Sequence, residues 1–242
     1  MTTEKIMTKK VFPDGKVTEA SSDCICEQRL IIRINGKDRY DIVCTSNDLH
    51  ELIIGRLFTD RIILSREDIT DIAFTGEYAD VTIHATDENA GGLMVCNTIT
   101  APSPRKKIDK LTKRIPDTKT VFDLISLFRN DGALHSSTGG THRCIVYLCG
   151  DTPVHCSFED ISRHNAVDKA VGHAVMKGYD LSRCILFTSG RVPVDMAEKV
   201  IAAKIPVRIS KSVPTAASVK LAKEYGLTLI CKAWQDSFEL FS

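Results

Sequence analysis

The stretch "RCILFTSGRVPVDMAEKVIAAKIPVRIS", residues 183–210, determines the fold class. It contains an apolar run that ends in "TSG", then a helical pattern in "VDMAEKVIAAK", then a second apolar run in "PVRIS". Strand, helix and strand in this order favour two parallel neighbours in one sheet, joined by a crossover helix. We therefore predict an α/β fold around this unit.

The same alternation continues on both sides of the unit. Before it, "RCIVYLC" and "TPVHCSF" are predicted strands, and "NAVDKAVGHAVMKG" is a predicted helix. After it, "TAASVKLAKEYG" has the helical spacing, while "LTLICKA" and "FELF" are predicted strands. These elements predict an α/β domain over residues 132–242.

The first part of the chain has a different pattern. "RLIIRI" and "RYDIVC" flank "NGKD", and Asn-Gly between two apolar runs is typical of a β-hairpin. "DIAFTGEYADVTIHAT" predicts a second hairpin that turns near Gly76, and "LHELIIGRLFTD" predicts a helix. Residues 1–97 thus form a β-rich region with one helix, and β structure is expected from Val11 to Cys44.

Residues 98–131 differ from both neighbours. From about Thr98 to Lys119 the chain is rich in proline and basic residues, which is typical of a solvated loop or linker. "TVFDLISLFRN" then predicts an amphipathic helix.

Composition narrows the class of protein. Of the 242 residues, 43% are hydrophobic and 26% are charged, as in ordinary globular proteins. The net charge of +1 gives no electrostatic support for binding nucleic acid or a membrane surface. The sequence shows no apolar membrane span or signal peptide, and it has nine cysteines without a C-x-x-C pattern. We expect a cytoplasmic protein with reduced thiols and no metal site.

Polar residues gather in four segments where α/β proteins bind ligands, outside strand ends and close to helix N-termini. Gly139 and Gly140 allow a backbone nest, and Arg163 and Arg191 could each fork onto a phosphate. Each segment alone could be a helix cap or a turn, whereas together they indicate a phosphate-rich ligand such as a nucleotide. Neither a P-loop nor G-x-G-x-x-G occurs. The segments are "SSTGGTH" at 136–142, "SRHNAVDK" at 162–169, "TSGRVP" at 188–193 and "SKSVPT" at 210–215.

His164 and Asp168 lie four positions apart in a predicted helix. This spacing places both side chains on one face, where a carboxylate-oriented imidazole could do acid–base work. The alternative is an ordinary pair on the helix surface.

Several of these stretches together resemble one family, the formate dehydrogenase accessory proteins of the FdhD/NarQ family. They are "CTSNDLHELIIGRLFTDRII", "TGGTH", "EDISRHNAVDK", "SGRVPVDMAEKVIAAKIPV" and "SVPTAASVKLAKEYGLTLI", in the family's order between Cys44 and Ser242. The resemblance implies a C-terminal domain with a cytidine deaminase-like mixed sheet and helices, a smaller β-rich N-terminal region and a homodimer.

The resemblance also implies a function. Members bind the molybdenum or tungsten bis(molybdopterin guanine dinucleotide) cofactor as cargo. They pass sulfur to it from a cysteine desulfurase before the catalytic subunit of formate dehydrogenase receives it. We expect Arg191 to contribute most to binding, because it stands at a helix entrance. The candidate cofactor-binding residues are Gly139, Gly140, Thr141, His142, Asp160, Arg163, His164, Asn165, Asp168, Lys169, Ser189, Gly190, Arg191, Ser212, Lys232 and Trp234.

The chain departs from the family at the residues that carry sulfur. The family loop has a C-G-x-C motif whose first cysteine bears the persulfide, but residues 100–103 here read "TAPS". A hydroxyl cannot replace the thiolate that sulfur transfer requires. Cys96 is the nearest thiol in sequence and is the candidate carrier, with Cys144 next. Ser162 also replaces a family glycine, and residues 232–237 differ from the family's aromatic and basic stretch.

Two functions remain open from the sequence. The protein either transfers sulfur to the cofactor, as an enzyme of the sulfurtransferase type, or binds and delivers the cofactor without sulfur chemistry. A zinc deaminase is suggested by fold analogy alone, and the chain lacks both H-x-E and P-C-x-x-C.

Overall fold

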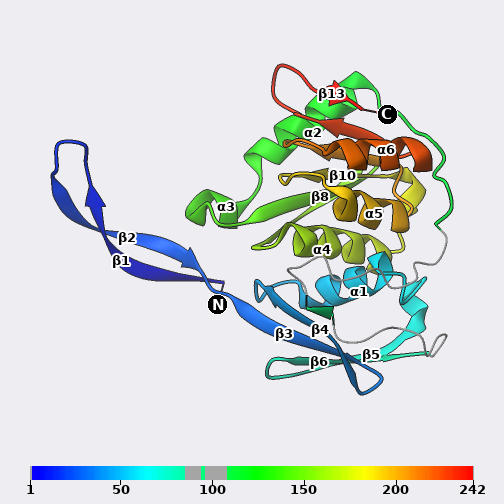
Figure 1. Ribbon diagram of the computed structural model, residues 1–242, viewed down its shortest axis with the longest axis horizontal. Coiled ribbons are helices and arrows are strands. Elements are labelled where there is room, and N and C mark those ends of the chain that lie inside the picture. Colours follow the sequence, from blue (N-terminus) through cyan, green and yellow to red (C-terminus); the bar gives the residue numbers. More distant parts are fainter. Residues whose placement is uncertain (1, 85–93, 96–107, 242) are drawn as a thin grey trace.

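The computed structural model describes residues 2–84, 94–95 and 108–241 (Figure 1). Its helices are α1 (Leu49–Thr59), α2 (Thr118–Asn130), α3 (Ala133–Thr138), α4 (Arg163–Met176), α5 (Val194–Ala202) and α6 (Ala216–Tyr225), with 3₁₀ turns at Arg66–Asp68 and Leu181–Arg183. Its strands are β1 (Thr3–Val11), β2 (Val17–Ile25), β3 (Gln28–Ile34), β4 (Lys37–Cys44), β5 (Ile69–Thr75), β6 (Tyr78–Ile83), β7 (Met94–Val95), β8 (His142–Leu148), β9 (Val154–Asp160), β10 (Cys184–Thr188), β11 (Val207–Ser210), β12 (Thr228–Cys231) and β13 (Glu239–Leu240).

The C-terminal sheet has the strand order β13-β12-β11-β10-β8-β9. Strands β10, β11 and β12 run parallel, and helices α5 and α6 form the crossovers between them. Strands β8, β9 and β13 pair antiparallel, which makes the sheet mixed. The α/β fold expected from residues 183–210 is confirmed, while the likeness to cytidine deaminases stays a prediction.

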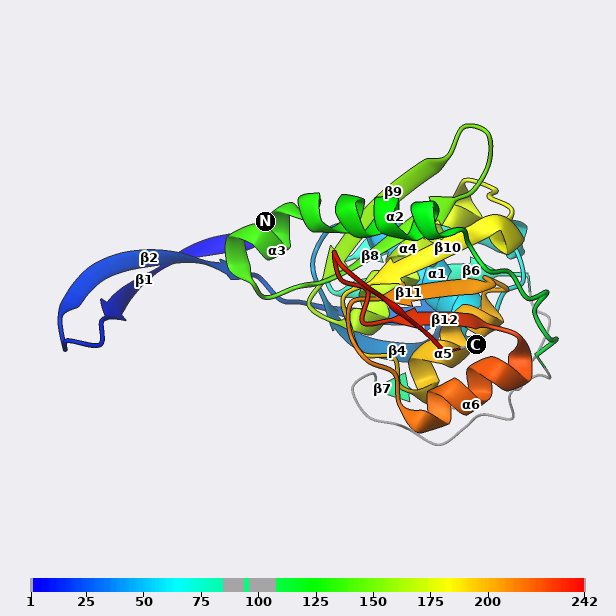
Figure 2. The same ribbon diagram turned by 90° about the horizontal axis from the view of Figure 1, so that it is seen from above.

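Helices cover both faces of this sheet (Figure 2). Along β10 the residues alternate, so that Ile185 and Phe187 pack against α2 and Leu186 packs on the opposite side with α4 and α5. Phe128 of α2 stacks on Phe187 with ring centroids 4.3 Å apart. Burial on both faces explains why β10 reads as a continuous apolar run.

The N-terminal sheet has the order β5-β6-β3-β4-β7. Asn35 and Gly36 join β3 to β4 with positive φ angles of 48° and 78°, as the Asn-Gly signal predicted. The second predicted hairpin is β5–β6, which turns at Gly76 with a φ of 59°. Helix α1 packs on this sheet through Leu52 and its apolar neighbours.

Helices α1 and α4 join the two sheets by an unusually close crossing. A Cβ atom on Gly55 would lie 1.8 Å from the carbonyl oxygen of Asp168, and one on Gly172 would lie 1.9 Å from that of Glu51. Only glycine at both positions allows the two backbones to touch in this way. The crossing fixes the N-terminal sheet against the C-terminal layers.

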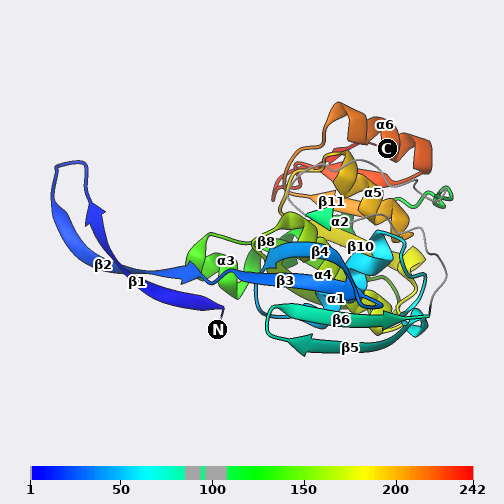
Figure 3. The same cartoon turned by 60° about the horizontal axis from the view of Figure 1, so that its bottom comes forward.

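Strands β1 and β2 form a two-stranded ribbon that projects from the body of the protein (Figures 1 and 3). Its nine residue pairs run from Thr3 opposite Ile25, at the root, to Val11 opposite Val17, at the tip. The sequence expectation placed β structure only from Val11 onward, because residues 3–10 lack an alternating apolar pattern. We call residues 3–25 the arm.

The predicted boundaries at residues 97 and 131 stay predictions. Of the expected basic loop, residues 98–107 lie outside the described part of the chain, and residues 108–117 form neither helix nor strand. Helix α2 then begins where Asp117 caps it by accepting a hydrogen bond from the Thr120 amide. None of the described helices combines the length and apolar character that a membrane span requires.

Candidate functional site

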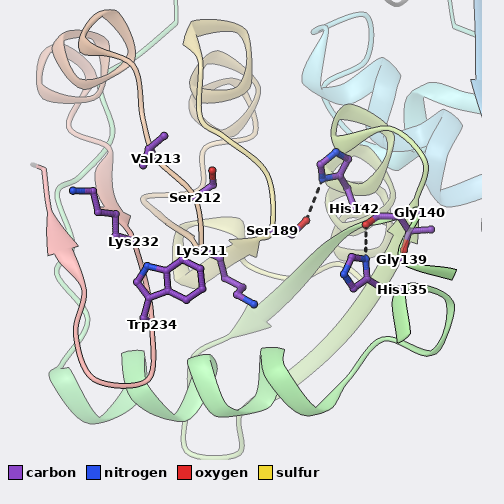
Figure 4. Close-up of a pocket in the computed structure, with 11 residues that line it drawn as sticks. His135, Gly139, Gly140, His142, Ser189, Lys211, Ser212, Val213, Lys232 and Trp234 are labelled. Carbon is purple, nitrogen blue, oxygen red and sulfur yellow. Dashed lines mark hydrogen bonds between the residues drawn. The ribbon is translucent and has the colours of Figure 1, made fainter. Parts of the chain in front are cut away.

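A pocket of about 650 Å³ opens at the edge of the C-terminal sheet where the parallel strands end (Figure 4). The loops after β10, β11 and β12 meet there with the start of β8 and with the loop after α3. This is the edge at which open α/β sheets bind their ligands. The lining residues are His135, Gly139, Gly140, Thr141, His142, Ser189, Lys211, Ser212, Val213, Lys232 and Trp234.

One wall combines a cation with an aromatic ring. Lys211 Nζ lies 5.4 Å from the centroid of the Trp234 indole, and 51% of Trp234 is exposed (Figure 4). The backbone fixes this wall, because Lys232 N donates to Ser212 O at 3.0 Å and Ala233 N donates to Ser210 O at 3.1 Å. Lys232 Nζ contacts Glu239 at 2.8 Å, so Lys211 contributes the less neutralised charge.

The opposite wall is the loop after α3, and a distant carboxylate holds it. Helix α3 follows Gly132, which has no side chain to cap the helix. Glu159 of β9 takes that role, accepting from the amides of Leu134 at 3.0 Å and His135 at 2.8 Å. It also accepts from Thr141 Oγ1 at 3.0 Å. Glu159 thereby fixes both ends of the segment that contains Gly139 and Gly140.

His142 and Ser189 connect the two walls at the base of the pocket. His142 Nδ1 lies 3.3 Å from Ser189 Oγ, which also accepts from the Arg143 amide at 3.0 Å. Burial, and then the nearby Arg163 guanidinium, lower the pKa of His142 below its ordinary value. His142 is therefore neutral at neutral pH and can become a further cation when the pH falls.

This shift predicts how the pocket responds to pH. The folded-state pKa of His142 lies below its unfolded value of about 6.5. As the pH falls below about 6.5 the unfolded state binds the proton more readily than the folded state, so the free energy of unfolding decreases. A bound anion should favour the charged imidazole and raise its pKa. We expect an NMR titration of His142 to give a midpoint below 6.5 that moves upward when sulfate is added. A midpoint above 6.5 without anions would contradict this electrostatic account.

The pocket can accept a negatively charged, partly planar ligand. Among the residues that line it there is no carboxylate, whereas two lysines, two histidines and hydroxyl groups are present. Trp234 offers a ring for stacking, and Lys211 offers a charge beside it. In the described ranges no group of three or more His, Cys, Asp or Glu side chains could hold a metal ion.

Half of the residues expected from the sequence line this pocket. Gly190 and Arg163 lie just behind it, because a Cβ atom on Gly190 would be 3.2 Å from Arg163 Cβ and 3.4 Å from His142 Nδ1. Arg191 is exposed beside them, ahead of α5. The expected residues in the pocket wall are Gly139, Gly140, Thr141, His142, Ser189, Ser212, Lys232 and Trp234.

Three of the expected residues lie inside the protein with at most 2% of their surface exposed: Asp160, Asn165 and Lys169. Asp160 Oδ2 accepts from Lys169 Nζ at 2.8 Å and from Thr45 N at 3.1 Å, while its Oδ1 accepts from Asn165 Nδ2 at 2.9 Å. Asn165 Nδ2 also donates to Val43 O at 2.9 Å. These contacts join α4 to the end of β4, and their placement lends no support to cofactor binding, which stays a prediction.

The expected pair of His164 with Asp168 is wrong. His164 Nε2 instead lies 2.6 Å from Asp195 Oδ2 on α5, and this contact lowers the pKa of Asp195. Asp168 is fully buried between two cations, 2.8 Å from Arg56 Nε and 2.7 Å from Lys199 Nζ. The helix turns Asp168 towards α1, where partners far away in the sequence hold it.

The sequence interpretation missed three contributors to the site. Lys211 lies within the segment "SKSVPT" and could have been predicted, since it directly follows the end of β11. His135 Nδ1 donates to Thr141 O at 2.8 Å, and Glu159 of β9 accepts from Thr141 Oγ1. Neither could be recognised from local sequence, because the short α3 gave no helical pattern.

Of the two candidate thiols, the structure describes Cys144 and not Cys96. Cys96 lies outside the described residues, as do residues 100–103. Cys144 is fully buried in β8, and burial raises the pKa of its thiol to about 12. A thiol in that state is a poor nucleophile, so Cys144 does not suit a sulfur carrier.

Fold and site together define an α/β protein with a pocket lined by lysine, histidine and hydroxyl side chains at the carboxyl edge of a mixed sheet. The model of the FdhD/NarQ family matches residues 25–242. The chain therefore belongs to the FdhD/NarQ family.

Individual relatives agree with this membership. A protein named sulfur carrier protein FdhD from Streptomyces coelicolor is 30% identical over 250 residues, covering 90% of this chain and 86% of the relative. A protein of the same name from Methanothermobacter thermautotrophicus is 28% identical, and the match covers 87% of this chain and 86% of that relative. A third, from Thermoplasma volcanium, is 36% identical, but that match spans only 52% of this chain and 45% of the relative.

One solved structure shares the whole fold. It is described as a putative formate dehydrogenase accessory protein from Desulfotalea psychrophila. The match has a TM-score of 0.84 and covers 100% of this chain and 97% of the other, with 21% sequence identity. At that identity the match shows the fold alone.

Proposed function

We propose that this protein holds the guanine nucleotide end of the molybdenum or tungsten bis(molybdopterin guanine dinucleotide) cofactor and serves formate dehydrogenase maturation. The observation that carries the proposal is the Lys211–Trp234 wall facing the Gly139–Gly140 loop across one pocket. A purine needs a stacking surface and a diphosphate needs donors and positive charge, and this pocket offers both. The cofactor is cargo and not a resident group.

The residues divide the work of binding. Trp234 presents its ring to the base, with about half of its surface open. Lys211 and the amide of Thr141 can donate to phosphate oxygens, whereas the amides of Gly139 and Gly140 already donate to His135 O at 2.8 Å and to Thr138 Oγ1 at 3.2 Å. Ser189 and Ser212 add hydroxyls at the base of the pocket, and His142 adds a proton when the pH falls.

We further propose that the protein works in the cytoplasm as a homodimer. Its partners in this role are a cysteine desulfurase, as the sulfur source, and the catalytic subunit of formate dehydrogenase, as the recipient. The names of the relatives, sulfur carrier proteins, support a role in sulfur transfer. The competing candidate is cofactor delivery without sulfur chemistry, and "TAPS" at residues 100–103 favours it because the motif holds no thiol.

Guanosine diphosphate binding tests the pocket directly. We expect the wild-type chain to bind GDP in isothermal calorimetry. Trp234→Ala should lose one base-stacking surface, which is worth about 1–3 kcal/mol. The affinity should then fall about 5- to 150-fold.

Phe74→Ala is the matched control, since Phe74 is an aromatic residue of similar exposure on β5, in the other sheet. Its GDP affinity should equal that of the wild type. Arg191→Ala tests the expectation that this arginine contributes most, with a loss of roughly 1.5–3 kcal/mol for one charged hydrogen bond. Equal affinities for wild type and Trp234→Ala would remove Trp234 from the site, and absence of GDP binding would overturn the proposed pocket.

A further inference from the structure

Sulfane sulfur needs an accessible thiol, and burial excludes most of the cysteines that the structure describes. Cys44, Cys144, Cys184 and Cys231 are buried, and burial raises the pKa of each thiol to about 12. Cys149 and Cys156 are half-buried, and burial raises their pKa as well. Cys24 is the exposed thiol of the described set, and Cys26 beside it is half-buried.

Cys149 and Cys156 also lie in the wrong part of the sheet. The pocket is at the start of β8, beside His142, whereas Cys149 follows the far end of that strand. Cys156 pairs with Val146 in the middle of β9, and Lys177 and Glu51 are among the charges around it. Neither thiol can face a ligand in the pocket.

Cys24 and Cys26 lie at the root of the arm, against the pocket rim. Strand β2 contacts α3, and Ile25 between the two cysteines touches the pocket loop. Its Cγ1 atom is 3.5 Å from the position that a Cβ atom on Gly140 would occupy. Gly140 lines the pocket, so Ile25 joins the root of the arm to the pocket wall, and Cys24 precedes it on the other face of the strand.

The two thiols lie close together in the chain, at the end of β2. Cys24 pairs with Glu4 in the ribbon, and the Cys26 amide continues the ladder by donating to Thr2 O at 2.9 Å. Successive residues of a strand point to opposite faces, so Cys24 projects from the face opposite to Ile25, and Cys26 follows directly after the end of β2. That face is open to solvent at Cys24, where another protein can reach the sulfur atom.

We propose that Cys24 is the sulfur carrier of this chain, with Cys26 as a neighbouring thiol, in place of the missing loop cysteines. The inference rests on the proposed role in sulfur transfer. In the loading step the Cys24 thiolate attacks the terminal sulfur of the donor enzyme's cysteine persulfide. The donor's S–S bond breaks, the donor thiolate leaves with the electron pair and takes up the proton, and Cys24 becomes a persulfide. One S–S bond replaces another, so no external oxidant or reductant is required.

A thiol at the rim suits the proposed cargo. In a bis(guanine dinucleotide) cofactor a ribose, a diphosphate and a pterin separate the metal from each guanine. A pocket that holds the nucleotide therefore leaves the metal end outside it. A sulfur carrier must stand beside the pocket and not within it, which is where the root of the arm lies.

Peptide mapping after sulfur loading tests the assignment. The full-length chain is incubated with a cysteine desulfurase and L-cysteine, alkylated, digested with trypsin without reductant and analysed by mass spectrometry. Trypsin yields residues 17–29 as one peptide that contains Cys24 and Cys26, while Cys96 falls alone in residues 67–105. We expect one added sulfur atom on residues 17–29, lost in Cys24→Ser and retained in Cys26→Ser and Cys96→Ser.

Other outcomes overturn the assignment. Sulfur on residues 67–105 would identify Cys96 as the carrier, and loss of loading only in Cys26→Ser would identify Cys26. A wild-type chain that binds GDP but gains no sulfur would sink this inference and leave cofactor delivery as the function. A chain that loads sulfur on Cys24 but does not bind GDP would instead overturn the nucleotide pocket.

Discussion

Replacing Asp168 by alanine is expected to destabilise the protein by about 3–5 kcal/mol, the usual cost of breaking a buried ion pair from one side. Asp168 is fully buried and neutralises both Arg56 of α1 and Lys199 of α5. It also accepts from Thr59 Oγ1 at 2.9 Å. Without the carboxylate, the two buried cations retain only Asp60 as a nearby counter-charge, 3.7 Å from Lys199 Nζ. For a chain of this size the melting temperature should fall by about 6–20 °C in a thermal scan.

Asp123→Ala provides the matched control. Asp123 forms a salt bridge of 2.6 Å with Lys119 on the surface of α2, and both side chains are largely exposed. The same substitution there should change the free energy of unfolding by less than about 1 kcal/mol. Similar melting temperatures for Asp168→Ala and Asp123→Ala would show that the buried pairs contribute no more than surface ones.

The second large effect is expected at the crossing of α1 and α4. Gly55→Val places side-chain atoms where the Asp168 carbonyl now lies, 1.8 Å from the new Cβ. Backbone of a packed helix cannot move aside as a flexible side chain can, so the two helices must separate. The loss should reach or exceed about 3 kcal/mol, the upper end of ordinary overpacking. Equilibrium denaturation with urea measures it, and Gly172→Val should behave alike because its Cβ would meet Glu51 O.

Gly150→Ala is the control for the glycine substitutions. A Cβ atom there would meet only Arg183 Nη2, at 2.9 Å, and that atom is the mobile end of a long side chain. Its stability should stay within about 0.5 kcal/mol of the wild type. If Gly55→Val unfolds at the wild-type urea concentration, the close backbone contact between the helices is not a feature of the protein in solution.

Much of the fold could be predicted because its signals are local. Asn35-Gly36 specifies its turn by positive φ angles, and the apolar runs around α5 are each long enough to identify a buried strand. Helix α3 and strand β1 were not predictable in this way. The start of α3 depends on Glu159, far along the chain, and β1 has few apolar residues and mostly exposed side chains.

The site was predictable only where its residues follow strand ends. Ser189 and Ser212 are examples, since topology alone brings such residues to one edge. Asp160 and Lys169 have the same polar character but different surroundings. Their partner Thr45 is more than one hundred positions away, so no local pattern distinguishes a residue that binds a ligand from one that joins two parts of the fold.

The length of the arm also has a practical consequence for labelling. Nine residues of strand at about 3.3 Å each place the turn at Pro13 and Asp14 about 30 Å from the root at Ile25. Exposed turns of this kind tolerate insertions well. A fluorophore at the turn, paired with a second one on the body of the protein, would report the distance between arm tip and body by energy transfer, and an affinity tag inserted there would leave the pocket and both root cysteines untouched.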